Sequence, residues 1–233
     1  MNIVVATRCL NEEQFLPIFL ANHPFASKIV ICDGGSDDQS KAIATNDPRV
    51  IWTEFTERVP GKHSGWRNPE GAHINATIDV AEALDPDWLY LTEMDAIPSL
   101  NLQRALPEVL EATGCSLVST WLCYVAPGCT EHYPQLMKGP GYTCWRKGLG
   151  RATNLDDPFE GQGALRINSP DEFIMNPSEG RIHLTFWTEE WVAKKAKFYE
   201  QVHGLNSEAA HPNARCGPRA AIPDWAKWNA TSA

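Results

Sequence analysis

The sequence predicts an α/β protein with a mostly parallel central sheet flanked by helices, followed by an irregular second half. In the first half, short runs of β-branched and apolar residues alternate with segments of helical periodicity. Such alternation is typical of parallel sheets, because the crossover between two parallel strands has room for a helix. From about Thr113 the sequence pattern changes, because glycine, proline and aromatic residues interrupt the hydrophobic periodicity.

The elements of the first half follow from local patterns. Four runs have strand character, at residues 2–6, 28–32, 49–55 and 87–92. A first helix is expected to begin at residues 11–13, because Phe15, Ile18 and Phe19 follow at helical spacing. A short second helix is expected at residues 41–45. Apolar residues on one helical face predict a third helix at residues 69–84.

The second half yields fewer elements. Residues 116–125 and 181–187 have strand character. Residues 126–177 between them show little clean periodicity, and so long an irregular stretch in a compact domain is usually a functional loop region. Thr188 is a suitable cap for a helix that continues through His203.

Length and charge limit the possible classes of protein. A chain of 233 residues predicts one domain over residues 1–204, with halves at 1–112 and 113–204, and a C-terminal strap over residues 205–233. The 20 Lys and Arg against 29 Asp and Glu give a net charge of −9. This acidity disfavours loose binding to nucleic acid, since that affinity comes from cations against phosphate. It is compatible with bound divalent cations, and solubility explains it equally well.

Cysteine usage and hydropathy predict the compartment. The seven cysteines include no C-x-x-C pair and no zinc-ligand spacing. Reduced thiols in a cytoplasmic protein are the simplest interpretation, with Cys9 and Cys32 at the ends of buried strands. No apolar stretch approaches the roughly 20 residues that cross a bilayer, so no transmembrane segment is expected.

Two acids follow the fourth predicted strand. Strand alternation places Glu93 and Asp95 on the same side of its end, with Met94 pointing the other way. In parallel sheets, ligands bind outside the carboxyl ends of the strands. Two carboxylates there suit a hard divalent ion such as Mg²⁺ or Mn²⁺. A solvated acidic strand end is the alternative interpretation.

The second predicted strand ends in a polar turn, residues 33–38. Asp33 can accept hydrogen bonds from a base or a ribose, and Gly34 gives the backbone freedom to approach a ligand. An ordinary strand-to-helix turn would use the same residue types.

Taken together, residues 4–13, residues 29–40 and the Glu93-Met94-Asp95 segment resemble the GT-A fold of nucleotide-sugar glycosyltransferases, and most of all family 2. The order and spacing of the three segments carry the resemblance, which covers about residues 2–110 and more weakly residues 181–203. It implies a nucleotide-sugar half at 1–112 and an acceptor half at 113–204. One departure is that Glu93 stands where the family's D-x-D signature has its first acid.

The resemblance also implies roles for individual residues. Asp95 would coordinate the metal on the donor's diphosphate, Glu93 would contact the ribose or the metal, and His183 matches a histidine that completes this site. A lone histidine on an apolar strand is otherwise more often a core residue. The residues that the resemblance places at the nucleotide sugar are Thr7, Arg8, Glu12, Asp33, Gly34, Arg67, Asn75 and Glu93.

Inverting transfer needs a carboxylate that deprotonates the acceptor hydroxyl. In similar enzymes this base follows the metal motif, where Asp156, Asp157 and Glu160 are available, with Glu131 behind them. We favour Asp157. Aromatic residues also gather in the second half, and such rings can stack on sugars or pack the core. They are Trp121, Tyr124, Tyr133, Tyr142, Trp145, Trp187 and Trp191.

The leading hypothesis is therefore a metal-dependent, inverting glycosyltransferase that uses Mn²⁺ or Mg²⁺ and a nucleoside diphosphate sugar, with a UDP-sugar favoured. The hydroxyl acceptor stays open among a glycan, a lipid-linked sugar, a protein and a modified nucleic acid base. One alternative is a nucleotidyltransferase-like enzyme, although residues 7–11 lack the glycine-rich phosphate loop that it would need. Another is a non-catalytic nucleotide-sugar or carbohydrate-binding protein of the same fold.

Overall fold

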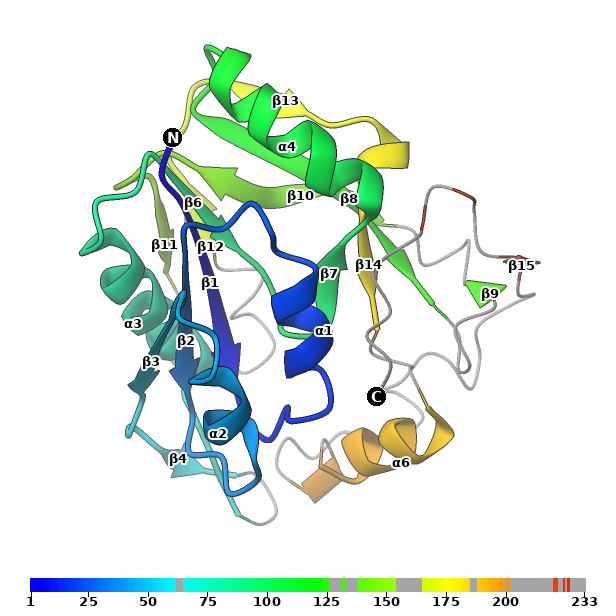
Figure 1. The fold of residues 1–233 in the computed structure, drawn as a ribbon. Coiled ribbons are helices and arrows are strands. Elements are labelled where there is room, and N and C mark those ends of the chain that lie inside the picture. The colour runs from blue at the N-terminus through cyan, green and yellow to red at the C-terminus, as the bar shows by residue number, and fades with distance from the viewer. Residues whose placement is uncertain are drawn as a thin grey trace.

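One large sheet organises the molecule (Figure 1). The computed structural model describes residues 1–61, 65–125, 131–132, 138–153, 165–184, 188–198, 200–201, 220–221, 224 and 226. Its nine-stranded sheet has the order β3-β2-β1-β6-β10-β8-β14-β7, and β13 pairs with β8 off this path. Most of the strand pairs are parallel, which confirms the predicted α/β class.

The first four predicted strands form the parallel part of this sheet. They are β1 (Ile3–Cys9), β2 (Lys28–Asp33), β3 (Val50–Glu54) and β6 (Trp88–Leu91). β1 lies between β2 and β6 and is parallel to both. Because the strands run the same way, their carboxyl ends meet at one edge of the sheet.

Helices cover both faces of the sheet. Alternate side chains of β1 separate two hydrophobic clusters, with Ile3 and Val5 in one and Val4 and Ala6 in the other. The first cluster includes apolar residues of α1 (Leu16–Ala21), α2 (Ser40–Ala44) and α4 (Leu100–Ala112). The second is covered by α3 (Glu70–Glu82). This two-sided burial fixes the strands in place and leaves their ends free for other roles.

The sequence prediction missed two elements that follow β6. Strand β7 (Ala96–Pro98) and helix α4 occupy residues for which no element was expected. Leu102, Leu106 and Leu110 bury one face of α4, and the Ser99 side chain caps it by accepting from the Leu102 amide at 3.2 Å. Pro107 lies inside the helix and weakens its sequence signal.

The expectation of an irregular stretch over residues 126–177 is wrong for much of its described part. β10 (Lys138–Trp145) lies between β6 and β8 and pairs with both in the antiparallel sense. Two glycines and a proline conceal this strand. Its pairing with β8 contains two register shifts, and the first, between Lys138 and Gly141, falls at Gly139 and Pro140. The region also contains β9 (Glu131–His132), β11 (Gly150–Ala152), β12 (Leu165–Ile167), β13 (Glu172–Ile174) and the short helix η2 (Pro177–Glu179).

The remaining predictions for the second half are confirmed where the structure describes them. The expected strands are β8 (Leu117–Tyr124) and β14 (Arg181–His183), the latter shorter than predicted, with residues 185–187 outside the described part. Thr188 Oγ1 accepts from the Trp191 amide at 3.1 Å and caps α6 (Glu189–Phe198). Of the proposed C-terminal strap, the described part includes β15 (Ala220–Ala221), which pairs with β9. A small hairpin of β4 (Val59–Pro60) and β5 (Trp66–Arg67) follows β3.

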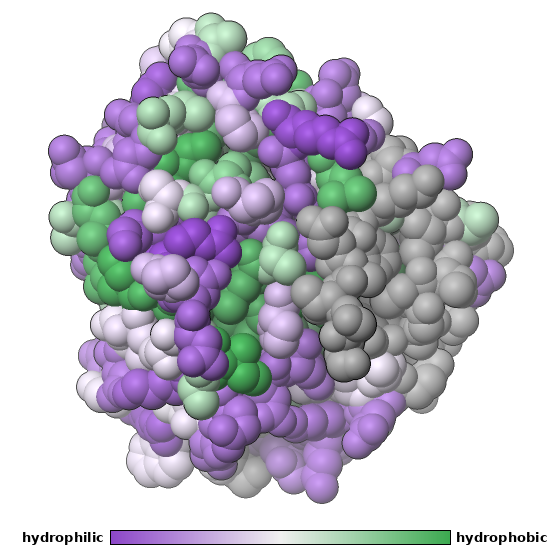
Figure 2. All heavy atoms as spheres, in the orientation of Figure 1, coloured by the Kyte–Doolittle hydropathy of each residue, from purple (hydrophilic) through white to green (hydrophobic). Residues whose placement is uncertain are grey.

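The surface is mixed in polarity. On the face drawn in Figure 2, hydrophobic residues form separate groups with hydrophilic residues between them. Cys9 and Cys32 are buried at strand ends as predicted, and no disulfide joins the described cysteines. Within the described residues, no helix has the length and apolar character needed to span a membrane.

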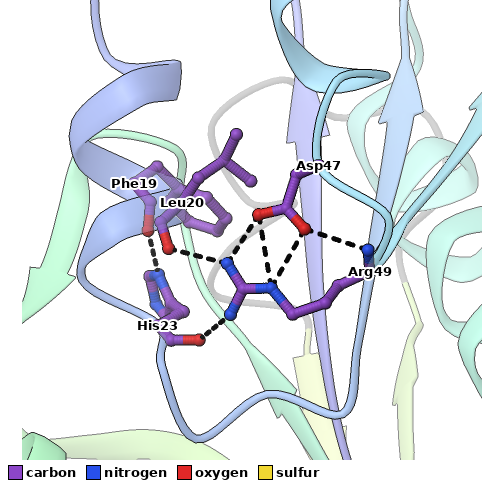
Figure 3. A network of polar contacts seen from close by, with 5 residues as sticks. All are labelled: Phe19, Leu20, His23, Asp47 and Arg49. Carbon is purple, nitrogen blue, oxygen red and sulfur yellow. Dashed lines mark hydrogen bonds and ion pairs between the residues drawn. The ribbon is translucent and has the colours of Figure 1, made fainter.

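An arginine secures the C-terminal end of α1 (Figure 3). The Arg49 guanidinium donates to the carbonyls of His23 at 2.7 Å and Leu20 at 3.0 Å, and it pairs with Asp47 at 2.6 Å. The His23 ring contacts the Phe19 carbonyl through Nδ1 at 2.7 Å. A carbonyl can only accept, so Nδ1 carries the proton of the neutral ring. The cation at the helix C-terminus thus joins α1 to the loop before β3.

Replacing this guanidinium should destabilise the fold. Arg49→Met is expected to lower the free energy of unfolding by about 1–3 kcal/mol, because it removes bonds to two part-buried carbonyls. Urea unfolding measures this change. As a control, Lys41→Met breaks an exposed ion pair with Glu54 and should leave the midpoint nearly unchanged. Equal midpoints for the two variants would contradict the role of Arg49.

Two buried histidines should make stability fall in mild acid. Burial lowers the pKa of His23 to about 3 and that of His73 to about 4. Both side chains are neutral in the folded state, whereas the unfolded chain takes up protons below about pH 6.5. Stability from these groups is therefore complete above pH 6.5 and decreases as the pH falls toward 4, by about 2 kcal/mol for each histidine at pH 5. Urea unfolding at pH 7.5 and 5.0 measures the loss. His23→Gln should lose about 2 kcal/mol less than the wild type over this interval, and an unchanged pH dependence would rule out His23 as a source.

Candidate active site

The two predicted acids lie in a turn at the carboxyl edge of the sheet. β6 ends at Leu91, earlier than predicted, so Glu93 and Asp95 do not continue the strand. The Ala96 amide donates to the Glu93 carbonyl at 3.1 Å, and Thr92 Oγ1 donates to the Ala96 carbonyl at 3.0 Å. These local bonds replace the strand ladder. Met94 is buried in the first hydrophobic cluster.

His183 reaches these acids from the far end of the chain. β14 pairs with β7 in the antiparallel sense, with His183 opposite Ala96, and the Leu184 amide donates to the Asp95 carbonyl at 2.6 Å. His183 Nε2 lies 2.7 Å from a Glu93 oxygen and 3.8 Å from an Asp95 oxygen. Asp95 and His183 are 5% and 6% exposed, whereas the Glu93 side chain is 33% exposed. The structure therefore brings the three predicted metal ligands together.

The chemistry of this group fits a divalent metal ion. Its two carboxylate oxygens and one imidazole nitrogen all lie within 4.8 Å of one another. Opposite ligands on an octahedral ion such as Mg²⁺ are about 4.2 Å apart, so small rotations would let all three bind one ion. Carboxylates suit Mg²⁺ and Mn²⁺, and imidazole suits transition metals. In the structure the Glu93–His183 hydrogen bond holds the group together.

The loops after β1 and β2 are joined by hydrogen bonds. The Asn11 amide donates to Ser36 Oγ at 2.8 Å, and the Asp37 amide donates to the Asn11 side chain at 2.9 Å. The Glu12 amide donates to Ser40 Oγ at 3.0 Å. Asn11 adopts a φ of 57°, a left-handed conformation that asparagine tolerates better than most residues. The predicted donor-site segments thus lie side by side.

Asp33 and Gly34 lie where these loops meet. Both carboxylate oxygens of Asp33 accept from the Ser36 amide, at 3.1 and 3.0 Å, and Oδ1 also accepts from Ser36 Oγ at 2.5 Å. A Cβ atom on Gly34 would lie 2.2 Å from Asn68 Oδ1, so a larger residue here would displace the Asn68 side chain. The predicted strand-to-helix turn therefore forms. A carboxylate has about four acceptor positions, so Asp33 could also accept from a ligand, and this contact stays a prediction.

Sequence reasoning missed one charged residue, Glu70, that interacts both with the loop after β1 and with the group of two acids and one histidine. Glu70, the first residue of α3, pairs with Arg8 at 3.0 Å. Burial raises the pKa of the Glu70 carboxyl, Arg8 and Arg67 oppose that rise, and Glu93 adds to it. Arg8, Arg67 and Glu93 are therefore electrostatic neighbours of Glu70. Acidic residues are common in the first turn of a helix because they interact favourably with the helix dipole, so Glu70 carried no sequence signal of a role in the site.

Other predicted site residues have varied surroundings. Thr7 is fully buried, and its hydroxyl donates to the Arg8 carbonyl at 3.2 Å. The Glu12 carbonyl accepts from the Phe15 amide at 2.9 Å in the turn before α1. Asn75 bonds twice to the backbone of Ala152, at 3.0 and 2.8 Å, so its amide joins α3 to β11.

The structure describes only some of the residues considered for the base and for sugar stacking. Asp156, Asp157 and Glu160, like Tyr133 and Trp187 and the Tyr142 side chain, lie outside what the structure describes, and Glu131 belongs to β9. Trp145 is fully buried, and Trp191 packs against Phe15 at 5.3 Å between ring centroids, so both serve the core. Trp121 is half-buried and donates to the Met175 carbonyl.

Comparison with solved structures identifies the fold. No protein-family model matches the chain, and no curated protein matches it at the sequence level. Residues 1–349 of S. aureus TarS match with a TM-score of 0.52 at 13% identity, over 90% of this chain and 68% of that one. The same TarS segment in complex with UDP gives 0.51 at 14% identity, over the same shares. The chain therefore has the GT-A-type fold that the sequence predicted.

Proposed function

We propose that the chain is a metal-dependent glycosyltransferase that transfers a sugar from a nucleoside diphosphate sugar to a hydroxyl acceptor with inversion. The observation that carries the proposal is the convergence of Glu93, Asp95 and His183 at the carboxyl edge of the sheet. A solvated acidic strand end would not bury an acid beside a histidine from a segment so far away in sequence. The GT-A-type fold adds support, since its ligands bind at this edge.

A UDP-sugar is the favoured donor. TarS, a structure with the same fold, has been solved with UDP. In this chain the nucleoside would contact Asp33, with Glu12 and Gly34 alongside, in the joined loops after β1 and β2. Thr7, which is fully buried, would support the first of these loops and not touch the nucleoside. Arg8 and Arg67 would face the diphosphate, because both cations act electrostatically on Glu70, as Glu93 of the metal site also does.

The metal and the base complete the proposed chemistry. Asp95, Glu93 and His183 would hold a divalent ion, Mn²⁺ or Mg²⁺, which stabilises the charge of a leaving diphosphate. Asp157, or else Asp156 or Glu160, would accept the proton of the acceptor hydroxyl. No feature of the described part of the chain selects one acceptor. A glycan, a lipid-linked sugar, a protein and a modified nucleic acid base all remain candidate acceptors.

Metal binding tests the site directly. Asp95→Asn should weaken Mn²⁺ binding at least about tenfold in calorimetry or in an electron paramagnetic resonance titration, because it removes a charged ligand. Its backbone carbonyl still accepts from the Leu184 amide, so the fold should persist. The matched control is Asp79→Asn, an exposed acid on α3 that pairs with Arg151 at 3.3 Å. Wild-type affinity in Asp95→Asn would exclude this acid as a ligand.

Transfer itself is tested with donors. Incubation with UDP-, GDP- and dTDP-sugars should give slow, Mn²⁺-stimulated release of the nucleoside diphosphate, fastest with a UDP-sugar, and Asp95→Asn should lose about two orders of magnitude of this rate. Chromatography of the released nucleotide measures it, and Asp79→Asn again serves as control. Nucleotide binding without turnover of any donor would favour a non-catalytic binding protein of the same fold instead.

A further inference from the structure

Tyr124 lies against the ring of His183. The two rings are stacked, with centroids 4.6 Å apart and planes inclined by 12°. Tyr124 is the last residue of β8, it is half-buried, and His183 is its register partner on the parallel strand β14. Neighbouring strands lie about 4.8 Å apart, so the register alone accounts for the ring spacing. The Val125 amide strengthens this pairing by donating to the His183 carbonyl at 3.2 Å.

The stack restrains a torsion that the backbone leaves open. Pairing with β7 and β8 fixes the His183 backbone. The ring can still rotate about its Cβ–Cγ bond, a torsion with broad minima in histidine. Rotation about that bond would move Nε2 away from Glu93 and Asp95. A flat neighbour against one ring face opposes this rotation while leaving the edge that carries Nε2 directed at the two acids.

We propose that Tyr124 is a positioning residue for His183, holding the imidazole plane in the orientation in which Nε2 shares one ion with Glu93 and Asp95. This inference rests on the metal site of the proposed function. Tyr124 acts here through His183 and does not itself contact the ion. The aromatic ring, and not the hydroxyl, supplies the restraint.

The first test needs no metal. In NMR spectra of the metal-free protein, the ring protons of His183 should be shifted upfield by the stacked ring in the wild type and in Tyr124→Phe. The shift should disappear in Tyr124→Leu, which keeps apolar volume without a ring. Ring protons of His183 at ordinary positions in the wild type would overturn the proposal, even if no variant folded.

The second test measures Mn²⁺ alone. Tyr124→Leu should weaken Mn²⁺ binding roughly three- to tenfold, and Tyr124→Phe should stay within about twofold of the wild type. Phe55→Leu is the matched control. Phe55 stacks on His73 at 4.6 Å and 9°, but this histidine bonds to the Cys32 carbonyl rather than to acids. Affinity in Phe55→Leu should not change, and thermal unfolding without metal shows that each variant is folded.

The outcomes separate the two proposals. If the wild type binds Mn²⁺ and Tyr124→Leu binds it equally well, the role of Tyr124 is overturned while the metal site stands. If Phe55→Leu weakens binding as much as Tyr124→Leu, the loss reflects general destabilisation and the positioning role is again overturned. If the wild type binds no Mn²⁺ and His183 still shows the stacked shift, the metal site fails and the role of Tyr124 in it falls with it.

Discussion

Antiparallel pairing between β14 and β7 brings His183 to two acids that precede it by 90 and 88 residues. The Leu184 amide bonds to the Asp95 carbonyl itself, so the backbone of one ligand is attached to the strand of another. β14 is held on its other side by β8. The geometry of the three donors therefore depends on main-chain bonds in the sheet more than on the side chains alone, and it is as rigid as the sheet.

The two hydrophobic clusters hold that sheet in place from both faces. Each central strand divides its side chains between them: Ile29 and Ile31 of β2 join one cluster, and Val30 joins the other. Arg49 adds a bond between α1 and the loop before β3 that apolar packing does not provide.

The sequence was most informative where local pattern and burial agree. The parallel strands and α3 could be predicted because their apolar periods match their final environment. β10 could not, because its glycines and proline oppose strand propensity and long-range pairing on both sides overrides it. The nearness of Glu93 to Asp95 is visible in the chain, and resemblance suggested His183. The contacts of Glu70 and Tyr124 depend on how distant segments are registered, which no local pattern encodes.

The hydrogen bonds between the loops after β1 and β2 make those loops cooperative. Asn11 donates its amide to Ser36 of the opposite loop and accepts from the Asp37 amide through its side chain. The Ser36 hydroxyl also donates to Asp33. Neither loop can open without breaking the bonds that order the other, so both belong to one unit of local unfolding. A ligand entering between them would meet a surface already ordered, and little conformational entropy would remain to be lost on binding.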